Sequence, residues 1–169
     1  METKENGVDI NKIIVELVEN NVNRIFSSAK ELFKDKYDKV KIKYNFAFKN
    51  YLIKASNKYS RIKTLLYRTE PKYLYDFFEC NTLVYRNTKI IAEDVNNILD
   101  ISKFIIIQGT GGMGKTTLMK HFFLNELIKD NLIPIFIELK DLNDNKTSIF
   151  ECLYNSLCKL GFNLEEKYF

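Results

Sequence analysis

The sequence contains few cysteines and no long apolar run, and each shortage excludes a class of protein. Its three cysteines, Cys80, Cys152 and Cys158, are too few and too scattered for a disulfide framework or a zinc knuckle. We therefore expect buried free thiols in a reducing compartment. No apolar run approaches the roughly 20 residues of a membrane-spanning helix. Polar residues also interrupt the region where a signal peptide would lie, so we expect a cytoplasmic protein without membrane contact.

Positive charge is in small excess and is unevenly distributed. The formal net charge is +4 over 169 residues, which is too mild to identify a partner by itself. The excess lies in residues 44–86, whereas residues 87–169 are slightly acidic. Hydrophobic residues make up 46% of the chain, so it can bury a core and global disorder is excluded. The length suits one domain or slightly more.

The most informative stretch is residues 109–116, which fit the phosphate-binding pattern G-x-x-x-x-G-K-[ST]. An apolar, β-branched run at 104–107 precedes the pattern, and a helical apolar pattern at 118–127 follows it. This order of strand, loop and helix is the context that a phosphate-binding loop requires. A glycine-rich turn with a purely structural use is the alternative, and the flanking elements disfavour it.

The residue types in this loop suit the phosphates of a nucleotide. Glycine removes the Cβ atoms that would keep a phosphate away from the backbone N–H groups. A helix that starts near Gly114 would direct its free N–H groups and its positive dipole end at the phosphate. Lys115 would contact the β- and γ-phosphate oxygens and is the catalytic candidate, while Thr116 would be a Mg²⁺ ligand. The predicted nucleotide-binding residues are Gly109, Thr110, Gly111, Gly112, Met113, Gly114, Lys115, Thr116 and Thr117.

Upstream of the loop, the sequence predicts a mainly helical region over residues 1–86. Apolar residues recur at three- and four-residue steps over 10–33, which predicts a long amphipathic helix with Asp9 as its cap. Its apolar face needs a partner surface, and packing within the chain fits better than a strict coiled coil. A linker at 34–43 and a second helix at 44–66 follow.

One flank of the second predicted helix is basic. Lys54, Lys58 and Arg61 recur there at helical spacing, beside several tyrosines. Tyrosine interleaved with basic residues is typical of some nucleic-acid contacts. Tyrosine rings packed in a core beside solvated lysines would produce the same pattern, and we favour this second interpretation.

The remaining segments are predicted to be short. Pro134 lies near the start of a second buried strand, where a missing N–H is tolerated, and Gly161 is expected to cap the last helix. In chain order the predicted elements are a hairpin or two short strands (74–86), a helix (88–101), a turn (130–131), a buried strand (133–139), a polar loop (141–147) and an amphipathic helix (149–160).

The loop form Gly-Thr-Gly-Gly-Met-Gly-Lys-Thr-Thr-Leu at 109–118 resembles the NACHT group of STAND-type P-loop NTPases. The apolar strand, polar loop and leucine-rich helix within 133–162 are similar to the second strand and helix of NACHT domains. Residues 58–66 and 74–77 look like the N-terminal helical module of bacterial members. The resemblance extends over residues 44–169.

This resemblance implies both a fold and a function. The fold would be α/β, with the incomplete parallel sheet of a P-loop NTPase over residues 87–169, preceded by an α-helical N-terminal region over 1–86. The function would be a signalling switch that binds ATP and Mg²⁺, self-associates in its full-length form when ATP is bound, and is reset by hydrolysis. Bacterial members of the group are implicated in defence against phage.

The sequence departs from the family pattern because no acidic Walker B strand follows the loop. Glu138 follows an apolar run, but that run comes directly after the phosphate-loop helix, where family members carry no catalytic acid. Without a Walker B acid, only Thr116 and phosphate would hold Mg²⁺. The sequence offers two candidate strands, whereas an α/β sheet usually has about four or more. We therefore expect the N-terminal piece of a longer NTPase that binds nucleotide but hydrolyses it slowly.

The alternative function is a P-loop enzyme that acts on nucleic acid, such as a DNA-dependent ATPase or a helicase loader that uses the basic segment 44–66. A steep salt dependence of DNA affinity would favour this alternative, and nucleotide-dependent oligomerisation would favour the switch. The only histidine, His121, lies on the helix face that turns away from the loop. A packed or surface imidazole is therefore a better interpretation of His121 than a catalytic base.

Overall fold

The computed structural model describes residues 38–63, 69–129, 133–145 and 148–164, together with Glu16 and Asn20. Glu16 and Asn20 are helical, but the rest of the predicted first helix and its packing lie outside the described residues, as does the predicted turn at 130–131. The described helices are α2 (Asp38–Tyr59), the short 3-10 helix η1 (Leu74–Asp76), α3 (Asn96–Leu99), α4 (Lys115–Lys129), α5 (Leu139–Asn145) and α6 (Ile149–Lys159).

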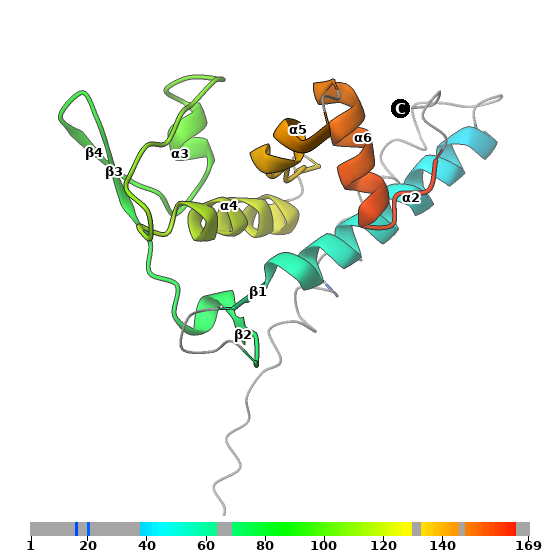
Figure 1. Cartoon of the computed structure of the whole chain (residues 1–169), viewed down its shortest axis with the longest axis horizontal. Helices are drawn as coiled ribbons and strands as arrows, with labels where there is room; N and C mark the ends of the chain where they lie inside the picture. The colour runs from blue at the N-terminus through cyan, green and yellow to red at the C-terminus, as the bar shows by residue number, and fades with distance from the viewer. Residues whose placement is uncertain are drawn as a thin grey trace, which may run out of the picture.

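In the described residues, the strands pair in two antiparallel ladders (Figure 1). The first joins β1 (Arg61–Ile62) to β2 (Lys72–Tyr73), and the second is a hairpin of β3 (Thr82–Tyr85) and β4 (Thr88–Ile91). Arg86 and Asn87 form the hairpin turn with φ angles of 47° and 68°, the two positive values that a type I′ turn requires. The parallel sheet expected from the sequence therefore stays a prediction.

The larger hydrophobic core lies where α2, α4 and α6 meet (Figure 1). Each helix contributes a side chain that is at most 1% exposed: Tyr51 from α2, Leu124 from α4 and Leu157 from α6. The ring of Tyr59 also packs edge-on against the ring of Phe123, with centroids 4.8 Å apart. Full burial of one such side chain stabilises the fold by about 1.5–3 kcal/mol. The helical region and the phosphate-loop helix thus share one core.

A smaller cluster joins the hairpin and α3 to the start of α4. Its buried members are Ala92, Ile98, Leu118 and Phe122. Ile107, two residues before the phosphate loop, packs against this cluster. The hairpin and α3 therefore pack against the residues that flank the loop on both sides, Ile107 and Leu118.

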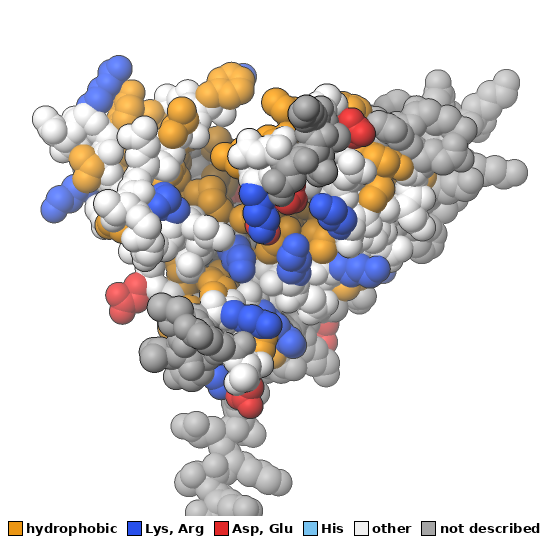
Figure 2. All heavy atoms as spheres, viewed as in Figure 1, with side chains coloured by type: hydrophobic (Ala, Val, Ile, Leu, Met, Phe, Trp, Pro, Cys, Tyr) orange, Lys and Arg blue, Asp and Glu red, His pale blue; other side chains and the backbone are white. Residues whose placement is uncertain are grey.

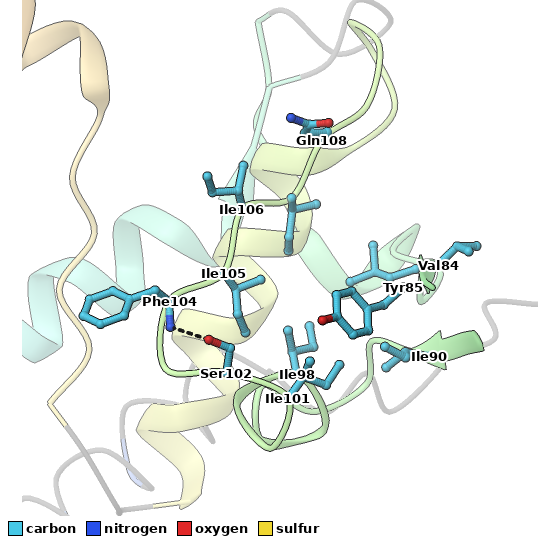
Figure 3. Close-up of a pocket in the computed structure, with 12 residues that line it drawn as sticks. Val84, Tyr85, Ile90, Ile98, Ile101, Ser102, Phe104, Ile105, Ile106 and Gln108 are labelled. Atoms are coloured by element: carbon cyan, nitrogen blue, oxygen red, sulfur yellow. Dashed lines mark hydrogen bonds between the residues drawn. The ribbon is translucent and has the colours of Figure 1, made fainter. Parts of the chain in front are cut away.

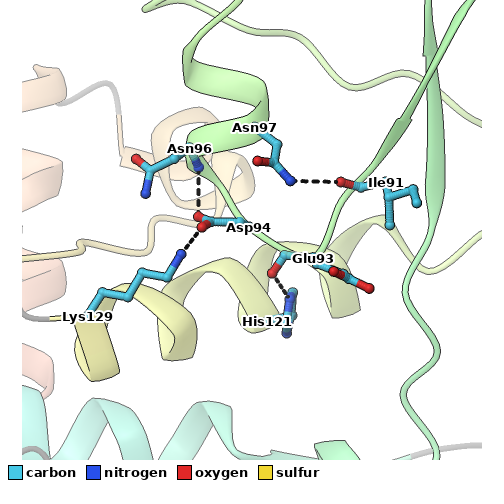
Figure 4. Close-up of polar contacts among 7 residues, drawn as sticks. All are labelled: Ile91, Glu93, Asp94, Asn96, Asn97, His121 and Lys129. Atoms are coloured by element: carbon cyan, nitrogen blue, oxygen red, sulfur yellow. Dashed lines mark hydrogen bonds and ion pairs between the residues drawn. The ribbon is translucent and has the colours of Figure 1, made fainter.

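Polar contacts attach α4 to the segment that precedes α3 (Figure 4). The carboxylate of Asp94 accepts a hydrogen bond from the backbone N–H of Asn96 at 2.9 Å and forms an ion pair with Lys129 near the end of α4. Nε2 of His121 lies 2.9 Å from the carbonyl oxygen of Glu93. Because that carbonyl can only accept, the imidazole donates through Nε2.

Two predicted boundaries in the helical region are wrong. The linker predicted at 34–43 is helical where it is described, because α2 begins at Asp38. The second helix ends at Tyr59, not at residue 66, because the chain turns into β1 and pairs with β2 there. Residues 64–68 lie outside the described part of the chain.

The helix predicted at 88–101 is also wrong in its first half. Residues 88–91 form β4, because the left-handed turn at Arg86 and Asn87 places them beside β3. Only the single turn of α3 remains helical. A hairpin or two short strands were predicted at 74–86, but this range contains η1 and only one strand, β3, whose hairpin partner β4 lies at 88–91.

Neither apolar run that was predicted as a buried strand is paired as a strand in the structure. Phe104 and Ile106 are 94% and 86% exposed, because no described strand lies beside them to supply backbone partners and cover. The second run, at 133–138, is held by side chains of α2 instead: the Tyr51 hydroxyl donates to the carbonyl of Pro134 at 2.9 Å. A strand needs a neighbour to form its hydrogen bonds, and a helix surface supplies none.

The last predicted helix is confirmed as α6. The hydroxyl of Ser148 caps it by accepting a hydrogen bond from the N–H of Glu151 at 3.2 Å. Gly161 follows the helix with a φ of 93°, as the predicted C-cap requires. The polar loop predicted at 141–147 is wrong where it is described, because α5 runs through it to Asn145.

An apolar pocket of about 310 Å³ lies between the hairpin, α3 and the segment 104–108 (Figure 3). Its wall includes Ile105 and Ile106 and ends at Gln108, one residue before the phosphate loop. The pocket is separate from the glycine loop and offers mainly apolar side chains. No helix in the described residues is long and apolar enough to cross a lipid bilayer. The three cysteines have free thiols, and Cys152 is buried.

Candidate phosphate-binding loop

The predicted phosphate loop is an exposed segment with two anchored ends. Ile107 anchors its start in the smaller cluster, and Leu118, which is 1% exposed, anchors its end. The N–H of Leu118 donates to the carbonyl of Gly114 at 2.8 Å and closes the first turn at the start of α4. Residues 109–113 are exposed, and Met113 is 60% exposed. The loop backbone is therefore accessible from solvent while its ends are fixed.

Lys115 is the first residue of α4, and its side chain folds back over the loop. The ammonium donates to the carbonyl oxygens of Gly109 at 2.7 Å and of Thr110 at 2.8 Å. The first turn of α4 contains no acidic residue. The positive end of the helix dipole and the Lys115 charge therefore act at the same place, and both favour an anion there.

Two of the loop glycines adopt a backbone conformation that other residues rarely take. Gly112 and Gly114 have φ angles of 80° and 79°, where a Cβ would cost roughly 1–2 kcal/mol. A Cβ added at Gly111 or Gly112 would meet no described atom within 4 Å. The glycines therefore allow the positive φ angles of the loop and leave its backbone open to solvent, as the sequence pattern predicts.

Thr116 lies in the first turn of α4 with an exposed side chain, and Thr117 is partly buried. Among the described residues, no group of three or more histidine, cysteine or acidic side chains could hold a metal ion. Mg²⁺ typically binds one or two protein ligands together with substrate phosphates and water. The Thr116 hydroxyl thus fits a Mg²⁺ ion that is bound together with phosphate.

Asn81 lies near the loop, and sequence reasoning did not identify it as a site residue. Its Oδ1 is 3.8 Å from the position of a Cβ added to Gly114. The N–H of Ala92 donates to its backbone carbonyl at 3.0 Å, at the base of the hairpin. The amide is thus held beside the start of α4, where it can donate or accept a hydrogen bond. In the sequence, it was only an asparagine that interrupts an extended pattern.

Glu138, the acid that could be mistaken for Walker B, lies close to three lysines. Its carboxylate forms an ion pair with Lys140. That contact is the main cause that lowers the pKa of Glu138, and the charges of Lys58 and Lys120 lower it further. Glu138 therefore stays ionised on the surface between α2 and α4. These partners support the prediction that it has no catalytic role.

His121 is a packed imidazole, as expected. It is 8% exposed, and its ring stacks on Phe78 with centroids 4.5 Å apart. With Nε2 donating to the Glu93 carbonyl, Nδ1 accepts from the Tyr75 hydroxyl at 3.2 Å. Burial raises the pKa of Tyr75 to about 12, so this hydroxyl keeps its proton. His121 thus fixes α4 to two other segments and faces away from the loop.

Comparison of the chain with protein-family models, with curated proteins and with solved structures found no match.

Proposed function

We propose that residues 109–117 bind the phosphates of ATP together with Mg²⁺, as the nucleotide-binding part of a NACHT-type signalling switch. The observation that carries the proposal is the position of Lys115. Its ammonium lies over the loop, beside the carbonyls of Gly109 and Thr110, at the first residue of a helix whose first turn has no acid. If the sequence motif had arisen by chance, there would be no reason for a lysine to lie over the loop at the start of a helix without an acid in its first turn.

When phosphate binds, the Lys115 ammonium would exchange its carbonyl partners for phosphate oxygens. The Lys115 ammonium has two carbonyl partners within 2.8 Å, and charged phosphate oxygens would form stronger hydrogen bonds with it than neutral carbonyls do. The exposed N–H groups around Gly111 and Gly112 would point at the same oxygens. Mg²⁺ would supply the positive charge that neutralises the phosphates, with Thr116 as its protein ligand.

The assignment to a switch rests on the resemblance to the NACHT group. In such a switch, ATP binding would permit copies of the full-length protein to associate, and hydrolysis would reset them. Bacterial defence against phage is the biological role that the resemblance favours. Because the 169 residues contain no acidic Walker B strand, we propose that this chain binds ATP and hydrolyses it slowly.

Thermal unfolding with and without nucleotide tests the proposal. A ligand that binds only the folded chain stabilises it by about 2.7 kcal/mol at a concentration 100 times the dissociation constant. Mg-ATP should therefore raise the unfolding temperature in a concentration-dependent way, and Mg-GTP should do so less. An unfolding temperature that stays constant with both nucleotides would refute phosphate binding. A larger effect of GTP would refute the choice of ATP.

A further inference from the structure

Basic side chains gather on one face of the molecule, over α2, α4, α5 and α6 (Figure 2). None of these residues belongs to the phosphate loop. They come from four helices and one strand that lie far apart in the sequence. We call this surface the basic face, and the contacts described below assign six residues to it: Lys54, Lys58, Arg61, Lys120, Lys140 and Lys159.

The centre of the basic face is the junction of α2, β1 and α4. The Lys120 ammonium lies 3.4 Å from the backbone carbonyl of Arg61, a residue 59 positions away in the chain. Burial and the charge of Lys58 lower the pKa of Lys120, although the negative charge of Glu138 opposes this shift. Positive charges are thus brought close enough to repel one another, which is an arrangement that a bound anion would stabilise.

The basic face extends from this junction to the end of α6. The side chain of Lys54 lies over Gly161, where an added Cβ would be 2.9 Å from the lysine Cδ and Nζ. Lys159, near the end of α6, lies 3.8 Å from Asp141. In the described part of the chain, the carboxylates of Asp141 and of Glu138, which pairs with Lys140, lie beside these six basic side chains. Most of the positive charge is therefore left for a partner.

Three of the cations form a row along α2 and β1. Lys54, Lys58 and Arg61 are exposed. Lys54 and Lys58 are both on α2 and are four residues apart, which corresponds to about 6 Å along the helix axis. Arg61 lies beyond the end of α2, in β1. The guanidinium of Arg61 also lies over the Tyr73 ring, 5.5 Å from its centroid, which supports its position. A row of this kind fits a polyanion with regular charges better than a single small anion.

We propose that the basic face binds the phosphate backbone of nucleic acid without sequence preference, in place of the solvated-lysine interpretation of Lys54, Lys58 and Arg61 that the sequence alone favoured. Contacts from lysine and arginine to phosphates provide affinity but carry no base information. A membrane surface is a poorer match, because such binding typically uses one amphipathic helix that lies in the plane of the interface. Here the cations come from crossing helices. The inference goes beyond the proposed nucleotide binding and does not depend on it.

The test is fluorescence anisotropy with a labelled DNA oligonucleotide at several salt concentrations. The test variant combines Lys54→Gln, Lys58→Gln and Arg61→Gln. The control variant removes the same charge elsewhere, by Arg86→Gln, Lys89→Gln and Lys103→Gln, at exposed positions on and beside the hairpin. Wild type should bind DNA with an affinity that falls steeply with salt.

The test variant should lose affinity by about tenfold or more, and the slope of log affinity against log salt should become shallower by roughly two to three. The control variant should keep a slope close to that of wild type. Lys58→Gln alone should reduce the slope by roughly one, which tests the proposal even if the triple variant unfolds. Binding of Mg-ATP should be unchanged in the test variant. A result that refutes DNA binding by the basic face is therefore distinguishable from one that refutes nucleotide binding by residues 109–117.

Three outcomes would overturn the inference. The first is wild-type protein that does not bind DNA even at low salt. The second is an equal loss of affinity in the test and control variants, which would mean that only net charge matters. The third is binding to phosphatidylserine vesicles without binding to DNA, which would identify a membrane surface instead.

Discussion

The carboxylate of Asp94 joins the start of α3 to Lys129 near the end of α4 (Figure 4). The same carboxylate accepts a hydrogen bond from the backbone N–H of Asn96, the first residue of α3, at 2.9 Å, in addition to its ion pair. Through these contacts, the segment that carries the smaller cluster is fixed to the phosphate-loop helix. The support of the loop therefore depends on a polar contact about four helical turns away from it.

Replacement of Asp94 should destabilise the fold in a pH-dependent way. Asp94→Ala removes the hydrogen bond from Asn96 and the ion pair, so it should lower the free energy of unfolding by about 1–2 kcal/mol at neutral pH. Hydrogen bonds from Lys129 and Asn96 hold the pKa of Asp94 below its usual 3.8. The contribution is therefore present above about pH 4 and is lost as the pH falls through the lower folded-state pKa.

Urea denaturation of wild type and Asp94→Ala at neutral and acidic pH measures this difference. The difference in free energy of unfolding between the two proteins should be present at pH 7 and should decrease as the pH falls below 4. Asp100→Asn, at an exposed position beyond α3, is the control for loss of one negative charge. An equal difference in free energy of unfolding at both pH values would contradict the assigned role of the Asp94 carboxylate.

Glu126 on α4 is a buried carboxyl group that the fold does not satisfy. It is 6% exposed, and neither carboxylate oxygen has a hydrogen-bond partner among the described residues. Burial raises its pKa above the usual 4.5, although the nearby Lys129 charge opposes the shift. The folded state therefore binds the proton more tightly than the unfolded state, and the fold loses stability as the pH rises from 4.5 through the folded-state pKa.

Glu126→Gln should stabilise the protein at neutral pH by roughly 1 kcal/mol, because it removes the cost of a buried negative charge. The gain should disappear near pH 4, where the native carboxyl group is protonated. Chemical denaturation at both pH values measures it, and Glu79→Gln at an exposed position is the control. An unchanged or lower stability at pH 7 would show that Glu126 has a partner in solution.

Two neighbouring isoleucines before the phosphate loop should respond differently to substitution. Ile107 packs on the smaller cluster, whereas Ile106 is 86% exposed. Ile107→Ser should cost about 1–3 kcal/mol of stability, and Ile106→Ser should change it by less than about 0.5 kcal/mol. Equal losses in urea denaturation would show that both faces of this segment are covered, as in a central strand of a sheet.

Sequence predicted the elements whose determinants are local. The helix α6 has its cap at Ser148, a regular apolar spacing and a glycine in the left-handed region, all within 14 consecutive residues, 148–161. That residues 109–117 bind phosphate stays a prediction, but the conformation of this loop is also set locally: Gly112 and Gly114 have positive φ, and Lys115 contacts the carbonyls of Gly109 and Thr110. In both cases the relevant contacts join residues that are close in the chain.

The elements that sequence did not predict depend on distant residues. The hairpin needs positive φ at Arg86, a residue that rarely starts such a turn. The run at 104–107 has strand-like composition, but composition cannot supply a neighbouring strand. Asn81 reaches the loop, and Lys54 reaches Gly161, only through tertiary packing. No local pattern marks either contact.

Calorimetric titration with Mg-ATP, on protein first shown to be folded by circular dichroism, tests the central claim most directly. Lys115→Ala removes the ammonium that lies over Gly109 and Thr110, so it should weaken binding by about 2–4 kcal/mol. Lys103→Ala, which removes an exposed lysine just before the loop segment, should bind as wild type does. Wild type that binds Mg-ATP at least about 30-fold more tightly than Lys115→Ala is the result we predict. Equal affinity of wild type and Lys115→Ala would contradict the assignment of this loop.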